Sequence, residues 1–151
     1  MLEDLKQITE LTSIKESNFF YQSFFKKEEI INIFRELKEN ELFSFDQLID
    51  ITAIDYPSKE NRFELIYILL SMKKNKRIIL KTLVNENDSI DSIIKIFKAS
   101  DWYERECYYL FGIKFNNHQD LRIIMTDSNF EGNPFRKDFP LTGYPEVRYD
   151  G

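Results

Sequence analysis

Glycine and proline, the residues that most often interrupt regular secondary structure, are concentrated at the C-terminal end of this chain. After Met125 lie three of the four glycines and three of the four prolines, namely Gly132, Gly143, Gly151, Pro134, Pro140 and Pro145. No long helix or strand is expected at such spacing. The helices and strands must therefore lie within residues 1–125, a length that suits one domain, and residues 126–151 are predicted to form an extended arm.

The predicted arm differs from a flexible linker because aromatic side chains alternate with charged ones. Its rings belong to Phe130, Phe135, Phe139, Tyr144 and Tyr149, and its charges include Arg136, Lys137, Asp138, Glu146, Arg148 and Asp150. Burying each ring contributes roughly 1.5–3 kcal/mol, whereas ordering each backbone residue costs roughly 1–2 kcal/mol. Ring burial alone falls short. The arm needs further partners, supplied by its own domain or, as we expect, by another protein.

A helix is predicted ahead of the arm, over residues 101–111. Asp101 suits the N-cap, and Glu104 follows at the spacing of a capping box. An apolar side with helical spacing is formed by Tyr103, Cys107, Leu110 and Phe111. We expect Glu104 and Arg105 to stay near water and Gly112 to end the helix in the left-handed conformation. The short apolar runs 113–115 and 121–125 predict a brief strand or extended pair.

The first hundred residues predict an α+β domain. Helical spacing over 26–40 places Ile30, Ile33, Phe34 and Leu37 on one face. Strands are predicted over 43–55, 63–70 and 77–84, the second buried on both faces and joined to the third as a hairpin. Further patterns predict an amphipathic helix within 2–15, an edge strand over 18–25, and a helix from Asp88 or Ser89 to Phe97. The result is a small mixed sheet of three to four strands with helices packed on one side.

Composition and charge argue against several classes of function. The chain carries a formal net charge of −5, whereas binding to nucleic-acid phosphates needs a basic face. A single cysteine, Cys107, and a single histidine provide too few ligands for zinc or an iron–sulfur cluster. No apolar run reaches the roughly 18 residues of a membrane helix, and no signal or transit peptide is recognisable. We therefore expect a soluble protein that binds no metal.

Few side chains are candidates for catalysis: Glu104, Glu106, His118, Asp120 and Asp138. Glu104 and Glu106 are two positions apart on the predicted helix and so point in different directions. The sequence has no glycine-rich phosphate loop, no Ser–His set and no nucleotide fingerprint. We predict no active site on this chain, and we expect Glu104, Arg105 and Glu106 to form structural ion pairs between the helix and the arm.

Two blocks of the C-terminal third carry a specific pattern. The first consists of Glu104, Arg105, Glu106, Tyr108, Leu110, Phe111, Gly112, Ile113, Phe115, His118, Leu121 and Arg122. The second consists of Gly132, Pro134, Arg136, Lys137, Asp138, Phe139, Pro140, Leu141, Gly143, Tyr144, Glu146, Val147, Arg148 and Tyr149. In this order and at this separation, the blocks resemble the 30 kDa subunit family of proton-pumping NADH:quinone oxidoreductase, respiratory complex I. The chain departs from the family's usual residues at Tyr109, Gln119, Ile123, Phe135 and Pro145.

The resemblance implies a non-catalytic core subunit in the peripheral arm of an enzyme that passes electrons from NADH to ubiquinone and pumps protons. Members of the family carry no redox centre, so NADH, FMN, iron–sulfur clusters and ubiquinone would be bound by the rest of the complex. The C-terminal arm would lie along a 49 kDa-type subunit near the quinone-reducing region. Its contacts would come from Phe130, Phe135, Arg136, Lys137, Asp138, Phe139, Pro140, Tyr144, Arg148 and Tyr149.

Two other classes of function stay open. Related subunits occur in membrane-bound nickel–iron hydrogenase complexes, although the continuation LTGYPEVRY favours the quinone enzyme; a free-standing small enzyme or binding module is the other class. Abundant Lys, Asn, Ile and Phe with little Gly, Pro and Ala suggests an AT-rich coding sequence. Together with the missing transit peptide, this composition predicts a mitochondrially encoded protein on the matrix side of the inner membrane. The alternative is the cytoplasmic side of a bacterial plasma membrane.

Overall fold

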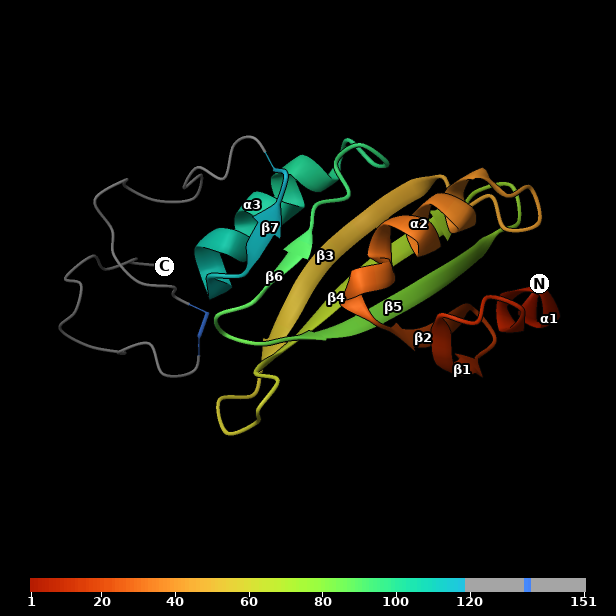
Figure 1. The fold of residues 1–151 in the computed structure, drawn as a ribbon. Coiled ribbons are helices and arrows are strands. Elements are labelled where there is room, and N and C mark those ends of the chain that lie inside the picture. Colours follow the sequence, from red (N-terminus) through yellow and green to blue (C-terminus); the bar gives the residue numbers. More distant parts are fainter. Residues whose placement is uncertain (119–134, 137–151) are drawn as a thin grey trace, which may run out of the picture.

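A five-stranded mixed β-sheet organises the part of the chain that the computed structural model describes, residues 1–118 and 135–136 (Figure 1). In spatial order the strands are β1 (Leu11–Glu16), β2 (Phe20–Phe25), β5 (Lys76–Val84), β4 (Phe63–Ser71) and β3 (Gln47–Asp55). Neighbouring strands are antiparallel, except that β2 and β5 are parallel. The predicted α+β class is confirmed, and the main sheet has five strands instead of three to four.

Three helices and a second, two-stranded sheet complete the described fold. The helices are α1 (Leu2–Lys6), α2 (Ile30–Glu39), which follows the 3-10 turn η1 (Lys27–Glu29), and α3 (Ser100–Phe111). The small sheet pairs β6 (Ser89–Asp91) in parallel with β7 (Lys114–Asn116). In Figure 1, α2 and α3 lie over the same face of the main sheet, toward opposite ends of it. The prediction of helices on one side is confirmed.

The core lies between this face of the sheet and the two helices. Alternate residues of β4 point into it, so that Phe63, Leu65, Tyr67 and Leu69 are all fully buried. The Phe34 ring of α2 meets Tyr67 edge-on at 4.9 Å between centroids, and Phe111 of α3 meets Phe63 at 6.2 Å. The other side chains of β4 are only half-buried. The prediction that this strand is buried on both faces was therefore wrong.

The clearest sequence patterns gave the correct elements. All four residues predicted for the inner face of α2 are buried, namely Ile30, Ile33, Phe34 and Leu37. Strands β3, β4 and β5 lie within or close to their predicted ranges, and β4 and β5 form the predicted hairpin. Asn75 ends the hairpin loop with φ 53°, a left-handed conformation that asparagine tolerates better than most residues.

The N-terminal segment differs from the prediction. The predicted helix within 2–15 is limited to the single turn of α1, and the chain then enters β1. Strand β2 is not at an edge, because it pairs with β1 on one side and with β5 on the other. Backbone pairing within the sheet outweighs a short helical pattern, because tertiary context overrides weak local propensity.

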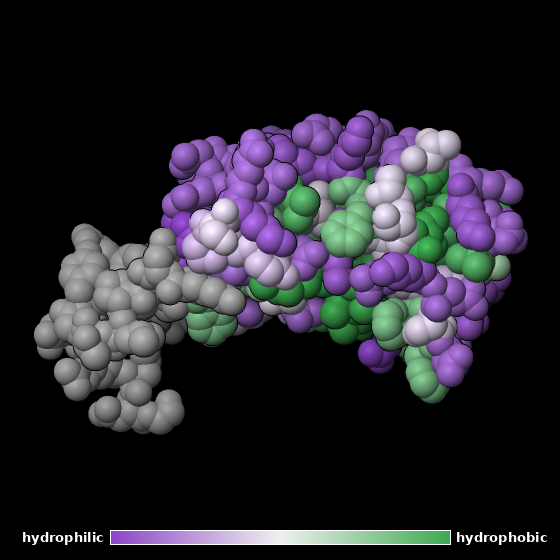
Figure 2. Space-filling model, turned by 90° about the horizontal axis from the view of Figure 1, so that it is seen from below, coloured by the Kyte–Doolittle hydropathy of each residue, from purple (hydrophilic) through white to green (hydrophobic). Residues whose placement is uncertain are grey.

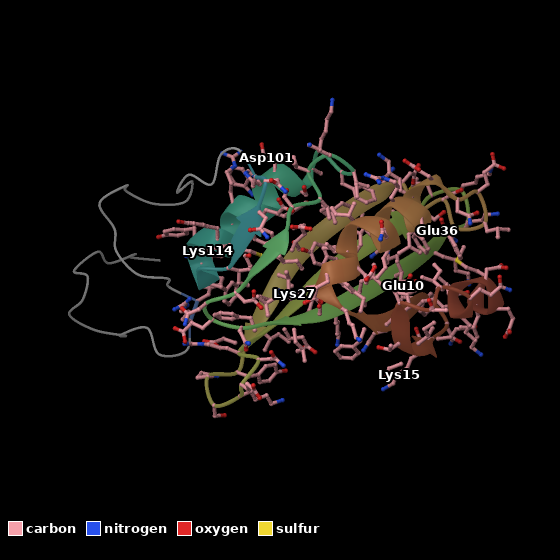
Figure 3. All side chains as sticks on the ribbon, in the orientation of Figure 1. Glu10, Lys15, Lys27, Glu36, Asp101 and Lys114 are labelled. Carbon is pink, nitrogen blue, oxygen red and sulfur yellow. The ribbon has the colours of Figure 1, made fainter. Side chains whose placement is uncertain are left out.

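Residues 88–97 form strand β6 and turns instead of the predicted helix. Asp88 does not cap a helix, since its carboxylate lies 2.9 Å from Nζ of Lys27, which also donates a hydrogen bond of 3.0 Å to the Ser89 carbonyl (Figure 3). The helical spacing of this segment rested on Ile90, Ile93, Ile94 and Phe97, of which Ile94 is half-buried and the other three are buried. Their spacing predicted which side chains are buried, but it did not predict the backbone conformation, which is a strand and turns instead of a helix.

Candidate functional site at the root of the C-terminal arm

The beginning of α3 is held by ion pairs and not by the predicted capping box. The helix starts at Ser100, and no side chain caps its first residues. Asp101 lies in the first turn, where Oδ1 is 3.1 Å from Nε of Arg105 and 3.0 Å from Nε2 of His118 (Figure 3). The guanidinium of Arg105 lies 5.8 Å from the centre of the Trp102 ring. Asp101 thus connects the first turn of α3 to the segment that follows β7.

Glu104 is fully buried, which contradicts the expectation that it stays near water. Its Oε1 accepts a hydrogen bond of 2.5 Å from the Ser92 hydroxyl, and Oε2 accepts one of 2.9 Å from the Ile93 N–H. The pKa of this carboxyl is raised to about 7, mainly by burial and also by the nearby charge of Asp101. The two hydrogen bonds act in the opposite direction and lower the pKa. Glu104 therefore fastens α3 to the turn that follows β6.

His118 is the last described residue before the interval 119–134. Its side chain is buried, and Nε2 lies 3.3 Å from the Asp101 carbonyl oxygen and 3.9 Å from Oε1 of Glu104. The chain leaving β7 is thus attached to the first turn of α3. Among the predicted ion-pairing residues, Arg105 pairs with Asp101, Glu104 accepts the two hydrogen bonds from Ser92 and Ile93, and Glu106 is half-buried on the same helix.

The end of α3 is contacted by the second described segment of the chain, Phe135 and Arg136. The last carbonyl groups of a helix have no partner within the helix. Here the Phe135 N–H donates a hydrogen bond of 2.9 Å to the Leu110 carbonyl, and Nε of Arg136 donates one of 2.6 Å to the Phe111 carbonyl. The helix itself ends at Gly112 with φ 79°, as predicted. The arm thus satisfies helix carbonyls of the domain from which it extends.

A chain of alternating charges runs from Arg136 into the interior. Nη1 of Arg136 lies 3.1 Å from Oε1 of Glu86, and Nη1 of Arg62 lies 3.3 Å from the same oxygen. Arg62 also donates two hydrogen bonds to the buried carboxylate of Asp55, at 2.7 Å and 2.9 Å. The guanidinium groups of Arg136 and Arg62 both lie over the Phe63 ring, with Cζ 5.3 Å and 5.4 Å from the ring centre, respectively. We call Phe135, Arg136, Glu86, Arg62 and Asp55 the arm-root cluster.

The structure describes only two of the residues predicted to bind a partner. Arg136 belongs to the arm-root cluster, and the ring of Phe135 packs edge-on against Phe111 at 5.8 Å while remaining 59% exposed. The others lie outside the described residues: Phe130, Lys137, Asp138, Phe139, Pro140, Tyr144, Arg148 and Tyr149. The predicted domain boundary after residue 125 and the catalytic candidate Asp120 also lie outside them.

Sequence reasoning missed Asp55, Arg62 and Glu86. Asp55 ends β3 directly opposite Phe63, so antiparallel pairing brings its carboxylate close to the neighbouring Arg62. This ion pair could have been predicted, because Asp55 stands at the end of one predicted strand and Arg62 just before the next. Glu86 offered none, because its position depends on how the loop after β5 crosses the sheet.

The described residues show few groups suited to chemistry. In residues 1–118 and 135–136, no group of three or more His, Cys, Asp or Glu side chains could hold a metal ion. Cys107 is buried, with Sγ 3.5 Å from the Ile51 carbonyl, and burial raises the pKa of its thiol. Thiols become reactive nucleophiles as thiolates. The arrangement of this site is therefore suited to holding a chain segment in place.

The described residues form a small α+β domain in which the end of α3 is contacted by Phe135 and Arg136. The chain belongs to the family described as respiratory-chain NADH dehydrogenase, 30 Kd subunit, since the family pattern matches residues 24–145. The resemblance inferred from the two sequence blocks is confirmed.

Relatives occur in bacteria and in mitochondria. The chain is 52% identical to a subunit of the NADH-quinone oxidoreductase of Rickettsia bellii over 121 residues, covering 80% of this chain and 62% of that protein. It is 54% identical to the mitochondrial NADH dehydrogenase [ubiquinone] iron-sulfur protein 3 of Candida albicans over 114 residues, covering 76% of this chain and 41% of that protein. The chain therefore spans less than two thirds of the length of these relatives.

Two solved structures share the fold. The trypsin-resistant fragment of Nqo5 matches with a TM-score of 0.65 and 23% identity, covering 80% of this chain and 96% of that one. A chain of the membrane-bound sulfane sulfur reductase, an archaeal respiratory membrane complex, matches with a TM-score of 0.78 and 24% identity, covering 93% and 83%. At these identities the likeness concerns the fold alone. In the described residues, no helix is long and apolar enough to cross a membrane.

Proposed function

We propose that this chain is a non-catalytic subunit in the peripheral arm of proton-pumping NADH:ubiquinone oxidoreductase. It stabilises the quinone-reducing module by binding a 49 kDa-type subunit. The observation that carries this proposal is the sequence identity with a bacterial NADH-quinone oxidoreductase subunit and a mitochondrial iron-sulfur protein 3. About half of the aligned residues are identical, over roughly four fifths of this chain.

The arm-root cluster explains how a short domain can present an arm to a partner. Arg136 pairs with Glu86 and with a helix carbonyl, so its charge is used on the domain side and fixes where the arm leaves α3. The exposed Phe135 ring then begins the contact surface, because exposed aromatic side chains are frequent anchors of interfaces. The remaining contacts come from Phe130, Lys137, Asp138, Phe139, Pro140, Tyr144, Arg148 and Tyr149.

The redox cofactors of such an enzyme belong to its other subunits. The Candida albicans relative carries the words iron-sulfur protein in its name. This chain has a single cysteine, whereas iron–sulfur clusters are held by several cysteine ligands. NADH, FMN, the iron–sulfur clusters and ubiquinone are therefore assigned to neighbouring subunits, and this chain serves in assembly.

Two truncations test the role of the arm. One chain ends after Met125, and the other ends after Arg136 and so retains Phe135 and Arg136. Each is co-expressed with a 49 kDa-type subunit, and the full chain serves as the positive control. Both truncated chains should remain folded by circular dichroism, and neither should co-purify with the partner. If the chain ending after Arg136 co-purifies as well as the full chain, the arm does not anchor the partner.

The alternative is the equivalent subunit of a membrane-bound nickel–iron hydrogenase complex, the other class of complex in which related subunits occur. The shared fold of the sulfane sulfur reductase chain is compatible with either complex. Affinity purification of the full chain separates the two functions, because the co-purified material would contain either a quinone-reducing module or a nickel-containing subunit. Recovery of neither would contradict both.

The membrane association of such a chain comes through its complex. Relatives include mitochondrial proteins and bacterial ones. We propose a location on the matrix side of the mitochondrial inner membrane, with the cytoplasmic side of a bacterial plasma membrane as the alternative. Immunogold labelling with an antibody against the chain would distinguish the two.

A further inference from the structure

Two turns lie side by side at the end of the sheet far from the arm root. Strands β2 and β5 are parallel, with Phe20 opposite Arg77, so the turn before β2 and the hairpin loop before β5 reach the same edge. Between them is a groove of about 730 Å³. In Figure 1 the β4–β5 hairpin lies at the right and the described segment Phe135–Arg136 at the left. The groove is therefore far from Phe135 and Arg136.

The groove is open but its walls are defined. In the first turn, the Ser17 N–H donates a hydrogen bond of 2.9 Å to the Phe20 carbonyl. In the hairpin loop, the Lys74 N–H donates one of 3.1 Å to the Ser71 hydroxyl, and Asn75 adopts the left-handed conformation that leads into β5. Because both turns are fixed by their own hydrogen bonds, the groove exists before any ligand binds.

The lining of the groove is more apolar than a solvated turn requires. Phe20 and Leu70 form part of it and are half-buried, whereas Phe19 is 80% exposed and Met72 is 63% exposed. Figure 2 shows hydrophobic side chains reaching the surface among hydrophilic ones on the half of the molecule away from the grey atoms. A large apolar side chain from another molecule could cover Phe19 and Met72 together.

The rim of the groove is strongly basic although the chain has a net charge of −5. Lys74, Lys76 and Arg77 line it, and Lys73 is exposed beside them. Acidic residues at this end of the sheet are Glu16, which ends β1 opposite Tyr21, and Asp46, which precedes Gln47 opposite Leu70; neither lines the groove. A cluster of four cations around an apolar floor is complementary to an anionic ligand that also carries an apolar group.

We propose that this groove binds an acidic segment of a partner protein, which inserts a Phe or Leu side chain between Phe19 and Met72. A concave site fits a protruding side chain, whereas a flat membrane surface would reach only the tips of the two turns. The groove lies at the Leu70 end of β4 and the arm root at the Phe63 end, about 23 Å away along the strand. The groove is therefore separate from the arm-root cluster.

The test uses the full chain and a defined probe. The probe is a fluorescein-labelled peptide in which one Phe and one Leu stand among Asp and Glu residues, and binding is followed by fluorescence anisotropy. Two further peptides separate the contributions: one has Ser in place of Phe and Leu, and one has Lys in place of the acidic residues. The original peptide should bind, and the other two should bind at least tenfold more weakly. Equal binding of the Ser peptide would mean charge attraction without a groove and would overturn the proposal.

Matched variants locate the binding site. Lys73→Glu with Lys74→Glu, and separately Phe19→Ser, should each weaken binding at least tenfold. Lys95→Glu with Lys98→Glu makes the same change of charge at exposed lysines outside the groove, and it should weaken binding less than threefold. Amide chemical shifts of the labelled full chain should change at Asn18–Phe20 and at residues 70–77. Equal losses in both double variants, or shifts elsewhere, would contradict the proposal.

A membrane surface is the competing ligand. Vesicles of phosphatidylserine and phosphatidylcholine are offered to the full chain, and binding is measured by co-sedimentation. If the chain sediments with the vesicles, loses this in the Phe19→Ser variant and shows no peptide binding, the groove region is a lipid contact and the proposal is wrong. Peptide binding that vesicles do not displace supports it.

Discussion

At the scale of single residues, the main difference from the prediction is the burial of the Glu104 carboxyl, which was expected to lie near water. It lies three and seven positions before Cys107 and Phe111, so helical spacing placed it on the buried side. Because the side chain is charged, it was predicted to be exposed to water. The sequence did not indicate the hydrogen-bond donors that allow this carboxyl to be buried. Those donors are the Ser92 hydroxyl and the Ile93 N–H. They come from a turn that was predicted to be helix, so one error concealed the other.

Glu104→Gln should flatten the dependence of stability on pH. The pKa is raised from 4.5 to about 7 in the folded chain, so the folded state binds more protons than the unfolded state between these values. The unfolding free energy therefore falls as pH rises through this interval, by at most about 3 kcal/mol. Gln resembles the protonated carboxyl and removes that fall. Urea denaturation between pH 4.5 and 8 measures it.

Glu106→Gln is the matched control on the same helix and should retain the pH dependence of the parent chain. A fall in stability that persists unchanged in Glu104→Gln would assign the titration to another group.

Arg62→Ala should strongly destabilise the fold. The substitution leaves the 2% exposed carboxylate of Asp55 without its two hydrogen bonds from the guanidinium. Breaking a buried ion pair in this way costs about 3–5 kcal/mol. Arg77→Ala, at an exposed position, should change the unfolding free energy by less than about 0.5 kcal/mol. Chemical denaturation compares the two.

The double variant Asp55→Leu with Arg62→Met examines the cause of that loss. Replacing both charges by apolar groups avoids a buried carboxylate that has lost the Arg62 guanidinium, so much of the stability should return. If the double variant is as unstable as Arg62→Ala, the loss comes from packing and not from the charge of Asp55.

At the scale of elements, the spacing of apolar residues predicted a helix or strand correctly where one face of that element is exposed to solvent. Helix α2 shows this, since its buried residues recur at helical spacing and its other positions are mostly charged. The β4–β5 hairpin was also predictable, because its strands are adjacent in the chain. Strand β1 was missed although its partner β2 is adjacent in the chain, because the same residues also showed helical spacing. Strand β2 was assigned to an edge and β6 was missed because their partners β5 and β7 are distant in sequence. Local pattern does not specify which remote backbone completes their hydrogen bonds.

The C-terminal end of α3 gives a prediction of its own. Arg136→Ala removes a hydrogen bond to the Phe111 carbonyl and an ion pair with Glu86, so the contact between the arm and the helix should loosen. Hydrogen exchange at the Phe135 amide, which donates to the Leu110 carbonyl, should accelerate at least fivefold. Lys114→Ala removes a nearby exposed cation (Figure 3) and should leave that exchange rate unchanged. Equal rates in both variants would show that Arg136 does not hold the arm.

At the scale of the whole molecule, the sheet separates two ends with different properties. One end carries the arm-root cluster on α3, and the other carries the basic groove between two turns. The predicted α+β class, the family and the last helix followed from sequence. The arm root did not, because its pairs join residues as distant as Glu86 and Arg136.

The two truncated chains should differ in thermal stability even though both are predicted to fold. The chain ending after Arg136 keeps two hydrogen bonds to helix carbonyls and the ion pair with Glu86, which the chain ending after Met125 lacks. Each such hydrogen bond contributes about 1 kcal/mol, so the longer chain should melt several degrees higher in calorimetry. Identical melting temperatures would mean that these contacts add nothing to the domain.

The parallel pairing of β2 with β5 also sets an order for folding during synthesis. The first two strands leave the ribosome well before β5 exists, and β5 is the neighbour that β2 needs on its second side. The β3–β4–β5 meander can form from adjacent segments. Pairing β2 with β5 closes a longer loop of chain and therefore costs more conformational entropy. The N-terminal hairpin is therefore fixed to the sheet late, and until then it exposes the aromatic run around Phe24 to chaperones.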